Sequence, residues 1–127
     1  MLDERHRPLA FTALMVALAV FQLALIAGAP LGHFAWGGQD RVLPAGKRVG
    51  SVVSIALYAL FALVVLQRAG LVEVLPGVVA DVGVWVIVAY SALGIVMNGI
   101  SRSKPERYTM APVCVVLTVL SVIVALG

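Results

Sequence analysis

Four long apolar runs dominate the chain, and short polar segments separate them. The runs cover about residues 8–29, 49–66, 77–100 and 111–126. A bilayer core of ~30 Å needs about 20 helical residues, and these runs reach or approach that length. They lack the strict alternation of a lipid-facing barrel strand, and a helix satisfies its own backbone groups in lipid. The pattern therefore predicts an all-α membrane protein, with residues 1–127 forming one domain of four transmembrane helices in an antiparallel bundle.

Composition supports a lipid environment. The chain is 62% hydrophobic and 12% charged, with a mean hydropathy of +1.09. Soluble domains carry roughly 25% charged residues, and a small soluble domain buries only about 60–70% of its unfolded surface. The net charge of +3 is then explained by membrane orientation and lipid phosphates rather than by nucleic acid. We expect membrane lipids as partners and no nucleic acid.

Prolines lie at three of the predicted helix ends. Pro8 suits the first turn of a helix, Pro30 is expected to stop the first helix, and Pro112 is tolerable in the first turn of the fourth. We interpret the first run as a permanent span. Cleavage of a signal peptide after Ala27 or Ala29 is the alternative.

Basic residues are divided unevenly between the two sides that four spans define. Loops one (30–48) and three (101–110) carry more of them than the N-terminal tail and loop two (67–76). The positive-inside rule then predicts cytoplasmic loops one and three and external N- and C-termini, in a bacterial cytoplasmic membrane. The first group is Arg41, Lys47, Arg48, Arg102, Lys104 and Arg107, and the second is Arg5, Arg7 and Arg68.

Each run presents one weakly polar helical face. Examples are Ser51, Ser54 and Tyr58 in the second run and Cys114, Thr118 and Ser121 in the fourth, because residues three, four and seven apart share a face. These faces are expected to point inward. Their hydroxyls and amides could bond between helices, or the faces could line a polar cavity. The candidate ligand-binding residues are Gln22, Tyr58, Tyr90 and Asn98.

Loop one combines glycines, aromatic rings and polar side chains. Phe34 and Trp36 fit an interfacial hairpin anchored by its rings, or a lid or re-entrant loop over a ligand. His33 and Asp40 could act as a general base and its orienting group, although no nucleophile accompanies them. The loop-one residues predicted to contact a ligand or lipid phosphate are His33, Trp36, Gln39, Asp40 and Arg48.

Loop three carries a compact set of hydrogen-bond donors. Cations here complement the negative end of the third helix and attract anionic lipid. A clamp in which Glu106 pairs with Arg102 or Arg107 is the structural alternative to a phosphate-bearing ligand. The donors are Ser101, Arg102, Ser103, Lys104 and Arg107.

No metal site or cofactor is expected. The chain has one cysteine, Cys114, and its histidines, His6 and His33, would lie on opposite membrane faces. Asp81, expected in the opening turn of the third helix, is the only acidic residue near a span and thus the only candidate for proton coupling.

The segments G-A-P (28–30), A-W-G-G (35–38), S-R-S (101–103) and M-x-P-V (110–113) together resemble a group of small, uncharacterised bacterial four-span membrane proteins. The resemblance carries over no activity. It implies only that a set of positions is worth testing. These are Trp36, Gly37, Gly38, Arg48, Asn98, Ser101, Ser103, Glu106 and Arg107.

Three functions stay open. The first is a non-enzymatic bundle that binds, or helps to transport, a small or lipidic ligand, as a homo-oligomer or as a subunit beside a larger membrane partner. The second is a membrane enzyme acting on a lipid headgroup or isoprenoid through His33, Asp40 and the loop-three cations. The third is a purely structural role in assembly.

Overall fold

The structure is a computed structural model that describes residues 5–127, so residues 1–4 of the predicted N-terminal tail lie outside the described residues. Within residues 5–127 the chain is helical and contains no strand. The elements are α1 (His6–Ile26), the 3₁₀ turns η1 (Gly32–Phe34) and η2 (Trp36–Gly38), α2 (Ala45–Arg68), α3 (Gly77–Gly99) and α4 (Lys104–Leu126).

Four helices of the described chain, α1 to α4, are each long and apolar enough to cross a membrane. Only 17–28% of the residues in their most apolar windows are buried within the protein. Large apolar side chains such as Val16, Val52, Val86 and Val119 point outward from all four helices. Lipid is the solvent that covers such surfaces, so the predicted four-helix membrane bundle is confirmed and the chain is a multi-pass membrane protein.

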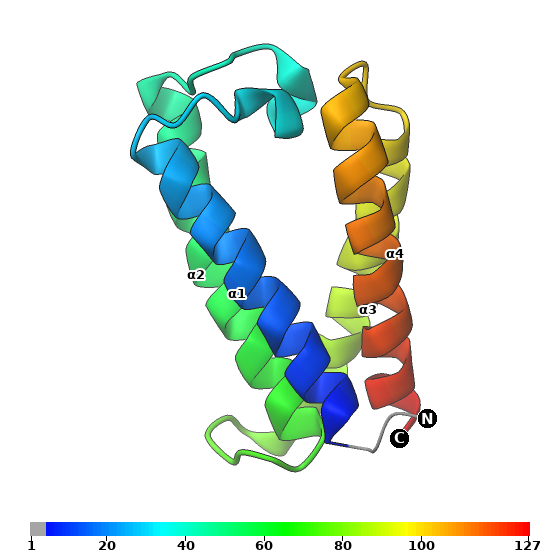
Figure 1. The fold of residues 1–127 in the computed structure, drawn as a ribbon. Coiled ribbons are helices and arrows are strands. Elements are labelled where there is room, and N and C mark those ends of the chain that lie inside the picture. Colours follow the sequence, from blue (N-terminus) through cyan, green and yellow to red (C-terminus); the bar gives the residue numbers. More distant parts are fainter. Residues whose placement is uncertain (1–4) are drawn as a thin grey trace.

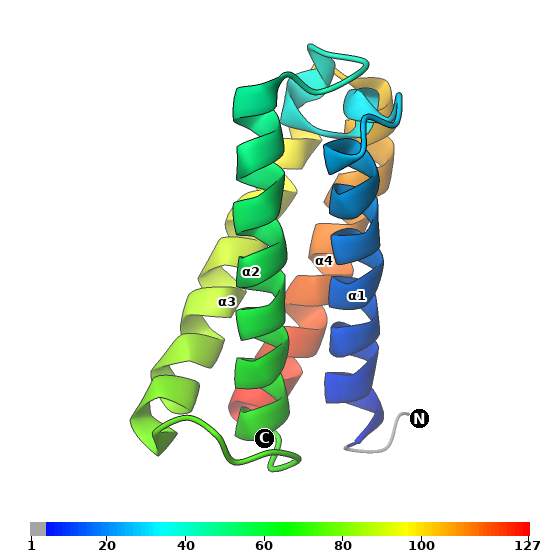
Figure 2. The same ribbon diagram turned by 90° about the vertical axis from the view of Figure 1, so that its left-hand side faces the viewer.

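The bundle consists of two antiparallel hairpins. α1 packs along α2, and α3 packs along α4 (Figure 1). The hairpins approach each other where α1 begins and α4 ends, and they diverge toward loop one, which crosses from one hairpin to the other (Figure 1). Seen from the side, α1 and α2 stand together in front of α3 and α4 (Figure 2). Contacts of α1 with α4 and of α2 with α3 close the ring of helices.

Glycine ends the first helix before the expected stop at Pro30. α1 finishes at Ile26, and Gly28 follows with a φ of +92°. The N–H groups of Gly28 and the next residue turn back to carbonyls of the last helical turn, which is a Schellman motif. α2 ends in the same way around Gly70, whose φ is +84°.

The fourth helix begins earlier than the predicted span at 111–126. It starts at Lys104, and Pro105 occupies its first turn. Pro112 therefore lies inside the helix, and its expected place in the first turn is wrong. A proline in this position removes one backbone hydrogen bond, but the turns on both sides of it pack along α3 and keep the helix continuous.

The first turns of α2 and α4 contain charged residues that the apolar pattern places in loops. α2 begins at Ala45, so Lys47 and Arg48 belong to its start, and α4 likewise contains Lys104 and Arg107. Because α1 also ends earlier than expected, the loop-one connection between helices lies at residues 27–44.

Packing is uneven along the bundle. The buried core lies in the half of the bundle that is remote from loop one. The half next to loop one contains few of the core side chains. The core side chains are Phe11, Met15, Val64, Val65, Val84, Ile87, Leu117, Leu120, Val124 and Ala125.

Candidate functional site: a roofed cavity between the hairpins

A cavity of about 340 Å³ occupies the half of the bundle that the core leaves open. All four helices and loop one contribute to its wall. The lining residues are Met15, Leu18, Phe21, Gln22, Phe34, Ala35, Trp36, Ser54, Tyr58, Phe61, Tyr90, Ser91, Leu93, Gly94, Met97, Asn98, Glu106, Met110, Val113, Cys114 and Leu117.

The four residues predicted to bind a ligand all line this cavity. Gln22 comes from α1, Tyr58 from α2, and Tyr90 and Asn98 from α3. The structure thus brings together side chains that the sequence places on separate polar helical faces. Whether they bind a ligand stays a prediction.

A hydrogen bond joins the two helices of the first hairpin at the cavity wall. The Gln22 amide Nε2 donates to the hydroxyl of Tyr58 at 3.4 Å. Behind it, the rings of Phe61 and Tyr90 meet edge to face, with centroids 5.2 Å apart. This aromatic pair connects α2 to α3 and thus the two hairpins.

A second amide joins the helices of the other hairpin. Asn98 Nδ2 donates to the carbonyl of Gly94 at 2.7 Å and lies 3.5 Å from Sγ of Cys114 on α4. Gly94 permits this approach, because a methyl group there would lie 2.9 Å from the Cys114 sulfur. Gly94 therefore serves close packing of α3 against α4.

Most hydroxyls on the polar faces bond within their own helix. Ser54, Thr118 and Ser121 donate to backbone carbonyls three or four residues earlier. The expectation that hydroxyls would join neighbouring helices is therefore wrong for these three. A local carbonyl is always within reach in a helix, whereas a partner on another helix must be placed by packing.

Loop one forms the roof. Phe34 and Trp36 line the cavity, and the Phe34 ring meets that of Phe21 edge to face at 6.4 Å. Trp36, Gly37 and Gly38 have consecutive positive φ angles of +55°, +72° and +74°. This left-handed turn is easy for glycine but strained for tryptophan, which points to packing that holds the ring in place.

Two contacts dock the roof on the start of α4. The hydroxyl of Ser103 donates to the backbone carbonyl of His33, and the N–H of Gly37 donates to Oε2 of Glu106 at 3.4 Å. Ser103 and Glu106 have the spacing of a capping box, in which each would bond the backbone of its own helix. Here Ser103 makes no side-chain cap and both side chains turn to loop one.

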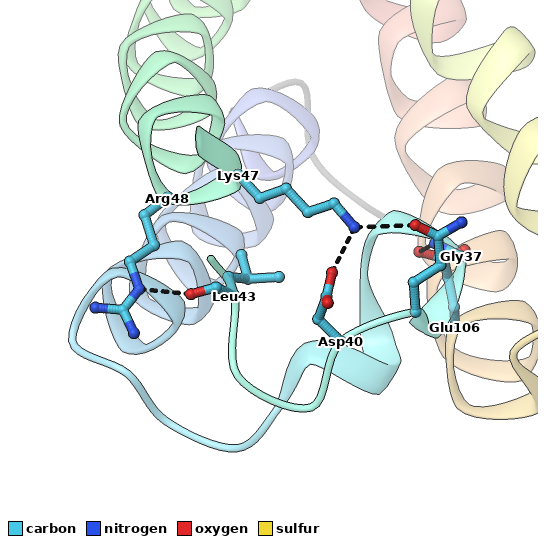
Figure 3. Close-up of polar contacts among 7 residues, drawn as sticks. Gly37, Asp40, Leu43, Lys47, Arg48 and Glu106 are labelled. Carbon is cyan, nitrogen blue, oxygen red and sulfur yellow. Dashed lines mark hydrogen bonds and ion pairs between the residues drawn. The ribbon is translucent and has the colours of Figure 1, made fainter. Parts of the chain in front are cut away.

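The other predicted loop-one residues stabilise the roof from outside the cavity. Lys47 binds the carboxylate of Asp40 at 2.5 Å and the amide oxygen of Gln39 at 3.1 Å (Figure 3). Its ammonium also lies 5.9 Å from the centroid of the Trp36 ring. Arg48 donates to the carbonyl of Leu43 at 2.7 Å (Figure 3).

The loop-three donors also lie outside the cavity lining. Ser101 is buried and accepts, through its backbone carbonyl, a bond from Arg107 at 3.4 Å. The guanidinium of Arg107 lies over the ring of Tyr108 at 4.9 Å. Arg102 and Lys104 are exposed at the end of the bundle where loop one lies.

The predicted catalytic pairing receives no support. The carboxylate of Asp40 is bound by Lys47, and His33 is exposed and lies outside the cavity lining. Loops one and three do meet on one end of the bundle, as a headgroup enzyme would require. Within residues 5–127, no group of three or more His, Cys, Asp or Glu side chains is placed to hold a metal ion.

Glu106 lines the cavity, although the sequence pattern placed it in loop three. The structural alternative for loop three paired it with Arg102 or Arg107, but its carboxylate accepts a bond from loop one, and the residue is part of the cavity lining. The Ser103–Glu106 spacing was the available signal, because it places both side chains at the start of a helix. Asp81, by contrast, lies beyond the first turn of α3 at the opposite end of the bundle.

Fold and cavity together define a small polytopic membrane protein in which two helical hairpins enclose an interhelical cavity under a loop. Comparison with protein-family models, curated protein sequences and solved structures finds no match to this chain. The resemblance to bacterial four-span proteins stays a prediction.

Proposed function

We propose that this protein binds a small amphipathic molecule in the cavity between its hairpins. The observation that carries the proposal is the cavity itself, formed where the packed core stops and loop one closes the bundle. Binding is the step that a transporter and an accessory subunit would share, so it is the step to test first.

The size and lining of the cavity suit such a ligand. Small-molecule sites measure roughly 300–1,000 Å³ and combine apolar walls with a few placed polar groups. This cavity falls at the lower end of that range, and its mostly apolar lining includes the polar residues Gln22, Tyr58, Asn98 and Glu106.

The bilayer offers a lateral route to the cavity. Tyr90, Leu93 and Met97 line the cavity from α3, yet they are 50%, 59% and 59% exposed. A wall residue that is also exposed on the membrane surface marks an edge of the cavity. We infer that the ligand enters from the hydrocarbon layer through this edge.

Native mass spectrometry of the protein released from membranes tests the proposal. We expect the wild type to retain a small molecule and the Tyr58→Leu and Asn98→Leu variants to lose it. Tyr108→Leu is the matched control, because Tyr108 is 68% exposed and lies outside the cavity lining. A wild type without any adduct, or an adduct that Tyr58→Leu retains as well as Tyr108→Leu does, contradicts ligand binding.

We further propose that loops one and three face the cytoplasm, with both termini outside, in a bacterial cytoplasmic membrane. The support is the excess of basic residues in the segments at that end. A reporter that is active only in the cytoplasm should be inactive when fused after Gly127, and activity there overturns this orientation.

A further inference from the structure

The lining of the cavity contains one acidic residue, Glu106. It is the only aspartate or glutamate among the lining residues, and no lysine, arginine or histidine of the described chain is part of the lining. The electrostatic preference of the cavity is therefore set by a carboxylate.

This carboxylate is poorly compensated by the protein. Glu106 is 7% exposed, and its bond from the Gly37 N–H is long for a hydrogen bond, at 3.4 Å. Its place in the first turn of α4 gives it a favourable helix dipole, but the capping-box partnership with Ser103 is not formed. A buried carboxylate is costly unless it is paired, so a positive charge beside it would be strongly favoured.

The nearby cationic side chains are engaged elsewhere. Lys47 is bound to Asp40 and Gln39, and Arg107 bonds the Ser101 carbonyl. Neither lysine nor arginine reaches the carboxylate of Glu106 within ion-pair distance in the described chain. The counter-charge is thus left for a ligand to supply.

Aromatic rings reinforce this preference. Six of the nine aromatic residues in the chain line the cavity, and the faces of such rings attract cations, most strongly where water is excluded. The six are Phe21, Phe34, Trp36, Tyr58, Phe61 and Tyr90.

We infer that the ligand is a hydrophobic organic cation with a single positive charge, such as a lipophilic amine or a quaternary ammonium or phosphonium compound. Glu106 is its counter-ion, and the aromatic wall holds its apolar groups. A zwitterionic lipid headgroup fits less well, because its phosphate would lie in a cavity whose lining offers an acidic residue and no cationic one. This inference rests on the proposed function, since it names the ligand class of the same site.

Three aryl-substituted probes of different charge test the inference, and the two ions among them share the same shape. They are tetraphenylphosphonium, the neutral triphenylphosphine oxide and tetraphenylborate. Binding is measured by equilibrium dialysis against the protein in the uncharged detergent dodecyl maltoside, and empty micelles are subtracted because all three probes partition into apolar phases. We expect the wild type to bind the phosphonium about tenfold or more tightly than the neutral probe, a difference of about 1.4 kcal/mol, and to exclude the borate.

Variants separate charge from shape. Glu106→Gln keeps an acceptor for the Gly37 N–H but removes the charge, so it should bind the phosphonium no better than the neutral probe and retain its affinity for the neutral probe. Asp81→Asn is the matched control, because Asp81 is an exposed acid at the opposite end of the bundle. It should bind all three probes as the wild type does.

The outcomes distinguish the two proposals. If the wild type binds the neutral probe or the borate as tightly as the phosphonium, the cavity binds ligands but the cation preference is overturned. An unchanged phosphonium affinity in Glu106→Gln also overturns it. If none of the probes binds, the cation inference fails, while adducts lost from Tyr58→Leu in native mass spectrometry would still uphold the proposed function. Should Glu106→Gln fail to fold, the comparison of the three probes on the wild type decides the question alone.

Discussion

The indole ring of Trp36 lies directly against the backbone of Gly50. A methyl group at position 50 would come within 2.7 Å of Cζ2 of the ring. This contact places the roof of the cavity on α2, while Ser103 and Glu106 place it on α4. Loop one is therefore held by both hairpins.

The Gly50→Ala variant should displace Trp36 from this contact. We expect greater quenching of Trp36 fluorescence by acrylamide, measured in a Trp85→Phe background so that Trp36 is the remaining tryptophan. Gly46→Ala is the control, because Gly46 lies in the same helix and a methyl group there meets open space. Both variants gain helix propensity worth up to about 1 kcal/mol, so equal quenching in the two would contradict the packing of Trp36 on Gly50.

Neighbouring glycines in loop one provide a second matched pair. Gly37→Ala and Gly38→Ala both force a side chain into a positive φ, which is costly at either position. Only at Gly38 would the methyl group also collide with Ser103, at 2.6 Å from its Cβ. We expect Gly38→Ala to lower the free energy of unfolding by about 1–3 kcal/mol more than Gly37→Ala does, as measured from thermal unfolding in detergent. Equal losses would show that loop one does not rest on α4.

A buried serine without a partner offers a stabilising substitution. Ser51 is 1% exposed and its hydroxyl has no hydrogen-bond partner within the described chain. Ser51→Ala should raise the free energy of unfolding by about 1 kcal/mol, because it removes an unsatisfied buried polar group. Ser121 is equally buried, but its hydroxyl donates to the Thr118 carbonyl at 3.0 Å. Ser121→Ala should therefore not stabilise, and titration with dodecyl sulfate can compare the two; a Ser51→Ala variant that is less stable than Ser121→Ala contradicts the assignment.

Arg68 holds the hairpins together at the end opposite loop one. Its Nη2 donates to the carbonyl of Ala125 on α4 at 2.8 Å, and its ion pair with Asp81 is longer, at 3.7 Å. We expect Arg68→Ala to cost about 1.5–3 kcal/mol in unfolding free energy, since a charge-assisted bond across the bundle is lost. Asp81→Asn should cost less than about 0.5 kcal/mol, because the side chain of Asp81 is 71% exposed. The same thermal measurement checks both, and a larger loss in Asp81→Asn would reverse this ranking.

Apolar length was sufficient to predict the four helices but not their ends. Hydrophobicity over about 20 residues locates a span, whereas Gly28 ends α1 through a local hydrogen-bond motif and Pro112 is carried inside α4 by packing on α3. The starts of α2 and α4 contain charged residues, so a rule based on apolar runs placed them in loops.

Helical periodicity located part of the candidate site. Gln22, Tyr58 and Asn98 stand out as polar side chains within apolar runs, and all three line the cavity. Periodicity could not show that Ser103 and Glu106 turn away from their own helix, because that depends on where a loop about 70 residues away comes to rest.

The docking of loop one depends on residues that come late in the chain. Its contacts at the start of α4, made by Ser103 and Glu106, follow the third helix in chain order, so the first hairpin is complete before these contacts can form. The cavity between the hairpins forms only when the second hairpin packs against the first. A truncated chain that stops before α4 would thus consist of the first hairpin and α3, and its loop one would lack the contacts with Ser103 and Glu106.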